Sequence, residues 1–284
     1  MSKKIINFAV VILTAITIIG LSSCKDEEVR YSCNPAIDAV IRQNLPRYEN
    51  MTRSEWKNLP DSLKSAAFVA MTPELKKEFW RGKQEEILSA RFFNDYEKEH
   101  ISKLYDYFLG IDDFYTEKYR NDLKRVLKVE EYYKEWAIYG VDSLKWDIVD
   151  VILIAEDKEE LTEDYIEHVK HNAPPFSNFE TKKPDCTCSY NIGCGVFTGY
   201  CDKKVDCTGV VDCGIGSSFV CTGICDEPTT NGNSNNGNSG TPKEIDPKIL
   251  EYLERLGQMS QRELLDVMFE QKMEAIKTDQ VEKK

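Results

Sequence analysis

Cysteine is the residue type whose spacing first indicates chemistry in this chain. The sequence has ten cysteines, and eight of them fall between residues 186 and 225. So dense a cluster is typical of small secreted domains that are held together by disulfide bonds. We therefore predict a disulfide-rich segment over residues 186–225, called the cysteine module below. Its predicted disulfide cysteines are Cys186, Cys188, Cys194, Cys201, Cys207, Cys213, Cys221 and Cys225.

Cross-links are needed because the cysteine module has little else to stabilise it. Disulfides can compensate for a small core by restricting the unfolded chain. Four bridges are the natural number, but eight cysteines allow 105 connectivities, among which the sequence does not choose. Cys33 is then an odd thiol, either free and buried or bonded to the module. The large apolar residues of the module are few, chiefly Tyr190, Phe197, Tyr200 and Phe219.

A structural zinc site is the competing use of clustered cysteines. Such sites favour two close cysteine pairs separated by a longer loop. Only Cys186 and Cys188 form a close pair here. We therefore expect no metal in the module and no cofactor in the chain.

The three histidines give little support for an enzyme. Glu97 and His100 have the Glu-x-x-His spacing of half a di-iron site, but no second copy of this motif follows. His168 and His171 lie near the predicted end of a helix, where two solvated side chains are the simpler interpretation. The sequence also lacks a nucleophile elbow and a Walker loop. We predict no catalytic residues and no enzymatic activity.

The N-terminus predicts the compartment. A basic start is followed by an apolar run over residues 5–21 and by Leu21-Ser22-Ser23-Cys24. A short apolar run with small residues before the cut is typical of a signal peptide, because a membrane span needs about 20 apolar residues. The Leu-Ser-Ser-Cys sequence resembles the lipobox of bacterial lipoproteins. This resemblance implies a signal peptide over 1–23 and lipidation at Cys24, whereas the alternative is a membrane anchor with an incidental cysteine.

Lipid on Cys24 would make the membrane a partner of the chain, with residues 24–34 as a tether. The acidic run that ends at Glu28 resembles the surface-export signal of some Gram-negative lipoproteins, although a solvated tether explains it as well. We expect an outer-membrane lipoprotein exposed at the cell surface, with the periplasmic side left open. A net charge of −12 and a pI near 4.9 argue against nucleic-acid partners.

Helical patterns dominate residues 35–172. Thr52 and Glu55 have the spacing of a capping box, and Pro73 follows Thr72 at a first helical position. We predict an all-α, bundle-like domain of six to eight helices over 35–172. Aromatic residues are dense in its second half, where a ligand groove is conceivable but a helical core is the simpler interpretation. One apolar face at helical spacing consists of Leu75, Phe79, Trp80, Ile87 and Leu88.

Two linkers are predicted to flank the cysteine module. Pro174 and Pro175 end the helical pattern, and a polar linker over 173–185 follows. A run rich in Asn, Gly and Ser forms the second linker, over 226–245, since it has too little apolar surface to pack.

Helical order is predicted to return over residues 246–278. Asp246 and Pro247 begin one amphipathic helix, and Ser260 with Glu263 forms the capping box of a second. Two short helices are unstable alone in water, so we expect them to dock onto the helical domain, or else onto a partner. The predicted fold class is thus mainly α, with a disulfide-rich module and a C-terminal helical pair.

Short motifs along the chain resemble one protein family. They are Cys33-Asn34-Pro35, Met51–Trp56, Thr72–Lys76 with Phe79-Trp80, Cys186–Ser189, Cys213-Gly214 and Cys221–Cys225. This set resembles the bacteriocin fulvocin C-related proteins over most of the chain from Cys33 to Cys225. The resemblance implies a lipid-anchored helical protein that presents a bacteriocin-like cysteine module.

Three functions follow from this sequence. The resemblance favours interbacterial antagonism, with the module as an effector that cleavage in the linkers would release. The module has three aspartates and two lysines, a net charge of −1, whereas membrane-disrupting peptides are cationic. Binding of a cell-surface target by the module is therefore the alternative, and a purely structural envelope lipoprotein is the third.

Overall fold

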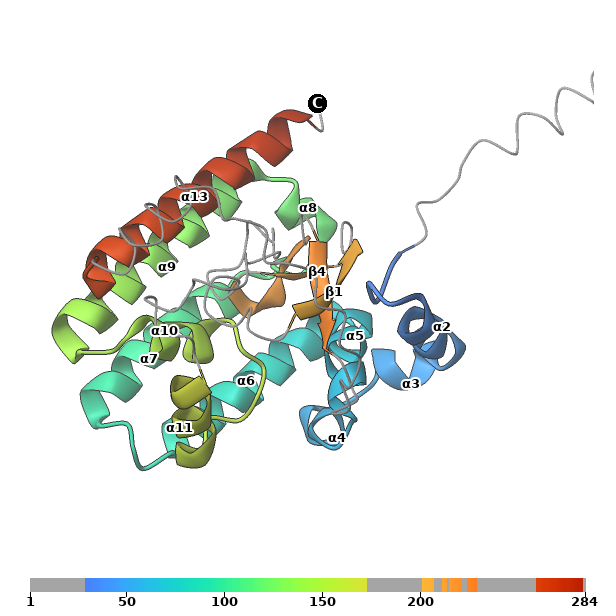
Figure 1. Cartoon of the computed structure of the whole chain (residues 1–284), viewed down its shortest axis with the longest axis horizontal. Coiled ribbons are helices and arrows are strands. Elements are labelled where there is room, and N and C mark those ends of the chain that lie inside the picture. The colour runs from blue at the N-terminus through green and yellow to red at the C-terminus, as the bar shows by residue number, and fades with distance from the viewer. Residues whose placement is uncertain are drawn as a thin grey trace, which may run out of the picture. The chain divides into compact units, whose positions relative to one another are not determined.

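The computed structural model divides the chain into two units, Met1–Arg30 and Tyr31–Lys284. Only Val29 and Arg30 of the first unit are described, so the predicted signal peptide and Cys24 lie outside the described residues. Within the described part of the chain, no helix is long and apolar enough to span a membrane. The described residues are 29–172, 201–206, 211–213, 215–220, 224–228 and 259–282 (Figure 1).

The second unit is mainly helical, as the sequence predicts. Residues 35–172 hold ten helices rather than six to eight, because helices such as α3 and α8 are too short for an apolar periodicity to reveal them. These ten helices are α2 (Pro35–Gln43), α3 (Leu45–Glu49), α4 (Arg53–Lys57), α5 (Asp61–Ala70), α6 (Pro73–Ser89), α7 (Asp95–Leu109), α8 (Glu117–Arg120), α9 (Leu123–Leu144), α10 (Ile148–Ala155) and α11 (Glu163–Asn172). Helix α13 (Gln261–Glu282) follows the cysteine module in the sequence.

Two predicted helix starts of this domain are confirmed. At α4 the Thr52 side chain accepts a hydrogen bond from the Glu55 backbone, and the Glu55 carboxylate accepts one from the Thr52 backbone. Thr72 caps α6 and Pro73 occupies its first turn. These side chains satisfy backbone N–H groups that have no partner inside the helix.

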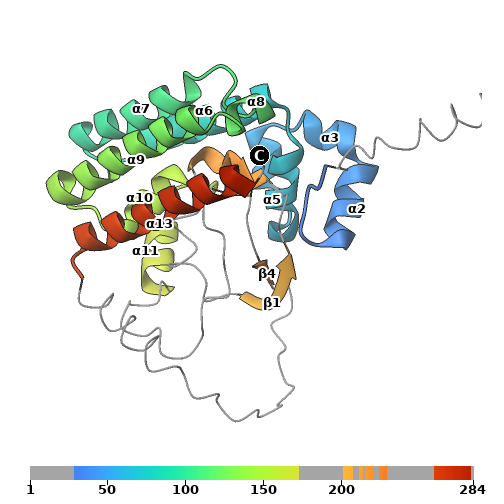
Figure 2. The ribbon, with the colours of Figure 1, turned by 90° about the horizontal axis from the view of Figure 1, so that it is seen from above.

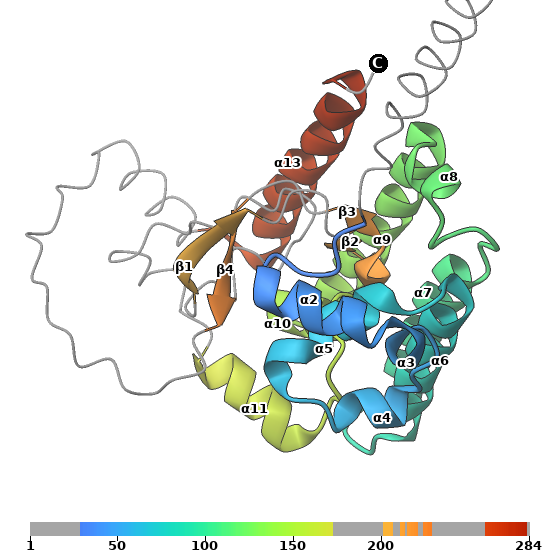
Figure 3. The ribbon, with the colours of Figure 1, turned by 90° about the vertical axis from the view of Figure 1, so that its right-hand side faces the viewer.

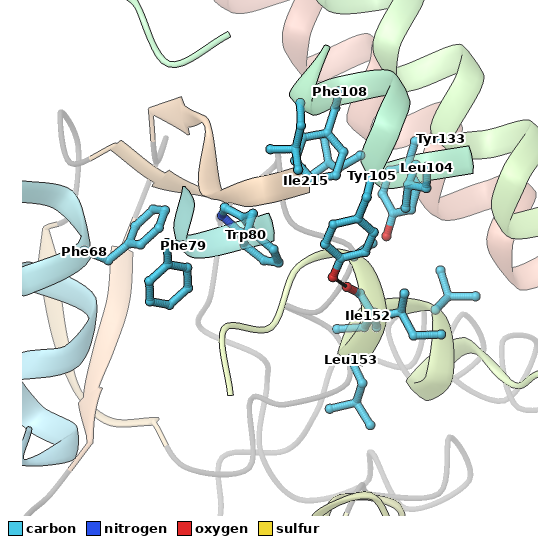
Figure 4. Packing of buried hydrophobic residues seen from close by; sticks show 14 of the residues in the cluster. Phe68, Phe79, Trp80, Leu104, Tyr105, Phe108, Tyr133, Ile152, Leu153 and Ile215 are labelled. Carbon is cyan, nitrogen blue, oxygen red and sulfur yellow. Dashed lines mark hydrogen bonds between the residues drawn. The ribbon is translucent and has the colours of Figure 1, made fainter. Parts of the chain in front are cut away.

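Helix α10 lies at the centre of the helical core. All of its residues except Asp150 are buried. Its C-terminal carbonyls are satisfied by side chains of neighbouring helices, since the Tyr105 hydroxyl donates to the carbonyl of Ile154 over 2.7 Å (Figure 4). Beside it, the ring of Trp80 lies 6.2 Å from those of Tyr105 and Phe108, centroid to centroid. These helices therefore share one core.

The cysteine module contributes two small antiparallel sheets. Strand β1 (Cys201–Asp206) pairs with β4 (Ile224–Pro228), and β2 (Val211–Cys213) pairs with β3 (Phe219–Val220). A 3-10 turn, η4 (Ile215–Ser217), lies between β2 and β3. The β1–β4 pair is visible in Figure 3. Each sheet has two strands, too few to form a core of its own.

The C-terminal helix α13 docks onto the helical domain. It packs along α9 (Figure 2), and the side chains of Leu264, Leu265, Phe269 and Ile276 are buried in the shared core. Ser260 and Glu263 form the interactions of the predicted capping box. The first helix of the predicted C-terminal pair falls on residues outside the described ranges.

Candidate functional site

Three of the eight predicted disulfide cysteines lie on described strands. Cys201 is opposite Pro228, Cys225 is opposite Val205, and Cys213 is opposite Phe219. The disulfides of the module remain a prediction, because no side chain of these strands is described. The other predicted cysteines lie outside the described residues: Cys24, Cys186, Cys188, Cys194, Cys207 and Cys221.

Cys33 is disulfide-bonded, which excludes the free-thiol alternative. The residues around it are held against the start of α2. The backbone N–H of Tyr31 donates to the Asp38 carboxylate over 2.7 Å, and the Asn34 side chain caps the helix. Asp38 also pairs with Arg42 at 2.5 Å. Cys33, one end of the disulfide, therefore lies in a segment that hydrogen bonds hold at the start of α2.

A turn of the cysteine module is buried in the helical domain. We call residues 215–218 the core turn. Ile215 and Ser218 are 0% exposed and Ser217 is 1% exposed. Ile215 belongs to the same hydrophobic core as the helices and lies beside Phe108 in Figure 4. This turn of the module is therefore part of the helical core.

Gly216 lets the core turn approach the aromatic rings. Its φ is +58°, and a Cβ atom added there would lie 3.0 Å from Tyr115 Oη, 3.1 Å from a Phe108 ring carbon and 3.4 Å from a Phe114 ring carbon. Such distances are shorter than ordinary contacts of a Cβ atom, so any side chain here would push its neighbours aside. A positive φ also favours glycine. We call Phe108, Phe114 and Tyr115 the aromatic socket.

Hydrogen bonds satisfy two backbone carbonyls of the core turn. The Tyr115 hydroxyl donates to the Gly216 carbonyl over 3.0 Å, and the Ser218 hydroxyl donates to the Ile215 carbonyl over 3.0 Å. Burial raises the pKa of Tyr115 well above its ordinary value, so the hydroxyl keeps its proton. Buried polar groups need such partners, because an unsatisfied one is costly.

A buried charge cluster joins α9, the end of α10 and α13. The Nζ of Lys272 lies 2.7 Å from a carboxylate oxygen of Glu130 and 3.7 Å from one of Glu156. The side chains of Lys272 and Glu130 are 2% and 0% exposed. Burial raises the pKa of Glu130, and the Lys272 charge opposes that change. The cluster is closed to solvent, so we assign it a structural role.

A second buried lysine, Lys83, holds the end of α10. Its Nζ donates to the backbone carbonyls of Leu153, over 2.6 Å, and of Asp157. Burial lowers the pKa of Lys83 to about 7. Lys83 thus serves as a neutral or charged donor to carbonyls that lack helical partners.

The histidine motifs have structural positions. The ring of His100 is stacked on Trp136, with centroids 5.2 Å apart, and its Nε2 donates to the Trp136 carbonyl over 2.9 Å. Glu97 completes the capping box of α7 and accepts a hydrogen bond from Trp146. His168 and His171 are exposed on α11. Among the described residues, no group of three or more His, Cys, Asp or Glu side chains is placed to hold a metal ion.

The dense aromatic residues form core rather than a ligand groove, in agreement with the simpler interpretation of the sequence. Between residues 105 and 139, seven of them are buried in the hydrophobic core: Tyr105, Phe108, Phe114, Tyr115, Tyr119, Tyr133 and Trp136.

The core turn and the buried charges were not predicted from the sequence. For Lys272 a signal exists, since it continues the helical spacing of the buried residues Leu265, Phe269 and Ile276. A lysine on an apolar face indicates a buried partner. The core turn carries no comparable signal, because its glycine and serines resemble any loop.

Comparison with protein-family models, curated proteins and solved structures finds no match. The functional argument therefore rests on the residues of this chain.

Proposed function

We propose that this chain is a lipid-anchored protein of the bacterial cell envelope whose helical domain presents a bacteriocin-like cysteine module. The disulfide bond of Cys33 is the observation that carries the proposal. Structural disulfides persist outside the cytosol, where thiols are not kept reduced. The lipobox-like sequence at Cys24 supplies the anchor in this account.

Anchoring is tested by metabolic labelling with an alkyne fatty acid. The wild-type chain is expected to carry the label and to sediment with outer membranes, and the Cys24→Ser variant is expected to carry none. Trypsin added to intact cells reports surface exposure, because only a chain outside the outer membrane is cut. An unlabelled chain in the soluble cytosolic fraction would contradict the proposal.

Contact-dependent antagonism is the first role proposed for the presented module, and the family resemblance supports it. Co-culture separates it from the alternatives. Cells that carry the wild-type chain are expected to reduce the viable count of susceptible neighbours, whereas cells with residues 186–225 deleted are not. Equal survival beside both strains, over a broad panel of neighbours, would contradict antagonism.

Binding of a cell-surface target is the second proposed role, and the module's net charge of −1 supports it. A weakly anionic module has no electrostatic attraction to anionic lipids. Purified protein is expected to bind whole cells in a pull-down and to lose this binding after reduction and alkylation. Binding that survives reduction would assign the contact to the helical domain instead.

A further inference from the structure

We propose that the core turn, residues 215–218, locks the cysteine module into the aromatic socket, so that the module stays bound when the chain is cut on both sides of it. This inference rests on the proposed function, because it describes how the module is presented. The partner of the socket is a segment of the same chain. The module then acts as part of the whole protein rather than as a released peptide.

Shape is the first argument for a lock. The socket rings lie so close to Gly216 that an added Cβ would be 3.0 to 3.4 Å from atoms of all three. Those rings also pack on one another, with centroids 5.4 Å apart for Phe108 and Phe114 and 5.1 Å apart for Phe114 and Tyr115. A larger residue at this position would have to displace these packed side chains, so the socket favours glycine in this turn.

The bonds made by the turn are the second argument. If the turn withdrew, the Tyr115 hydroxyl would lose its acceptor at Gly216. The fully buried side chain of Ile215 would also enter water together with the rings that it covers. Both losses oppose release.

The contact extends beyond the turn itself. Strand β2, which precedes the turn, lies against α5. The ring of Phe68 on α5 lies 6.5 Å, centroid to centroid, from the Tyr115 ring. The described residues of β2 and the core turn thus lie against α5, α7 and the segment that carries the socket. Cutting the flanking chain breaks none of these contacts.

The test must separate the lock from the Cys33 disulfide, which can hold the module covalently. The mature chain is prepared with Cys33→Ser, with free thiols alkylated, and with specific protease sites inserted in residues 177–185 and 229–241. After cleavage, size-exclusion chromatography without reductant is expected to show the module fragment eluting with the helical fragments. A module that elutes alone while the helical fragments keep their circular dichroism would overturn the proposal.

Variants of the socket identify the lock. Gly216→Val is expected to lower the retained fraction of the module at least tenfold, because a β-branched residue strongly disfavours the positive φ of this position and its side chain would have to displace the socket. Tyr115→Phe, which loses only a hydrogen bond, is expected to speed dissociation severalfold. Tyr119→Phe is the matched control, since the Tyr119 hydroxyl is buried without a hydrogen-bond partner among the described residues.

Two results would overturn the assignment of the lock to the core turn. One is retention of the module in Gly216→Val at the wild-type level. If that variant does not fold, equal dissociation rates for Tyr115→Phe and Tyr119→Phe would have the same meaning. Neither result depends on lipidation or on the cell surface, so failure of the lock and failure of the proposed function are distinguishable.

Discussion

Lys272 of α13 lies 2.7 Å from Glu130 of α9, with both side chains almost fully removed from solvent. The C-terminal helix therefore inserts a positive charge into the core of a domain that the preceding helices have formed. Edge-to-face packing of Phe269 on Tyr133, with centroids 5.1 Å apart, surrounds this pair with apolar rings. A buried pair is not worth more than a well-packed apolar contact, but breaking it is costly.

Lys272→Met is expected to lower the free energy of unfolding by about 3–5 kcal/mol, because it leaves the Glu130 carboxylate buried without its counter-charge. Urea unfolding followed by circular dichroism measures the loss. Replacing both partners, as Lys272→Met with Glu130→Leu, is expected to restore most of it. Lys103→Met is the control, since Lys103 pairs with Glu99 at 2.8 Å on the surface, and no measurable change is expected. A double variant less stable than Lys272→Met would contradict this account.

Stability is expected to rise with pH above neutrality because of Lys83. An unfolded lysine holds its proton up to about pH 10.5, whereas burial lowers the pKa of folded Lys83 to about 7. Between these pH values the unfolded chain binds more protons, so the Lys83 contribution to the free energy of unfolding increases by about 1.4 kcal/mol per pH unit. Lys83→Met removes this contribution.

The measurement is urea unfolding of the wild type and of Lys83→Met at several values between pH 7.5 and 9.5. Other titrating groups contribute to both curves, so the difference between them isolates Lys83. The groups that act on it are Asp157, Arg53, Lys158 and Glu86, and all four remain in the variant. A difference that stays flat over this range would show that Lys83 is charged in the fold.

Local sequence signals predict the helices of this chain well. The capping boxes at Thr52 and Ser260 and the proline after Thr72 act within one turn of backbone, and each helix begins where they indicate. One-turn helices such as α8 are not predicted, because four residues are too few to show an apolar pattern with a 3.6-residue period.

Long-range contacts explain what the sequence does not reveal about the candidate site. The bond from Tyr115 to Gly216 joins residues that are 101 apart, and neither residue has a neighbour that indicates the other. The short strands of the module are not predicted for a related reason. They are paired through backbone hydrogen bonds, and their residues show no alternating apolar pattern that would indicate a strand. The sequence predicts only part of the Lys272 pair. The position of Lys272 on an apolar helix face indicates that it is buried, but it does not indicate that its partner is Glu130.

Gly140→Ala is expected to destabilise the fold by about 1–3 kcal/mol through crowding. An added Cβ would overlap one ring carbon of Trp146 and lie 3.0 Å from a second. The sign of this change in stability is informative, because replacing glycine by alanine inside a helix otherwise stabilises it by about 1 kcal/mol. Thermal unfolding provides the measurement, and Ser143→Ala at an exposed position of the same helix is the control. A higher melting temperature for Gly140→Ala would mean that Trp146 moves aside freely.

Lys145→Gly is expected to stabilise the fold by about 1 kcal/mol. Lys145 ends α9 in the left-handed conformation, with φ 64° and ψ 26°, where the Cβ of any L-residue is crowded. Its ammonium group donates to the Asp142 carbonyl over 2.6 Å at an exposed position, a bond that water can replace. Lys128→Gly makes the same change in the interior of α9, where glycine costs about 1 kcal/mol. The midpoint of chemical unfolding should therefore move to higher denaturant concentration for Lys145→Gly and to lower concentration for Lys128→Gly. A loss of stability in both variants would mean that the hydrogen bond to Asp142 outweighs the strain at Lys145.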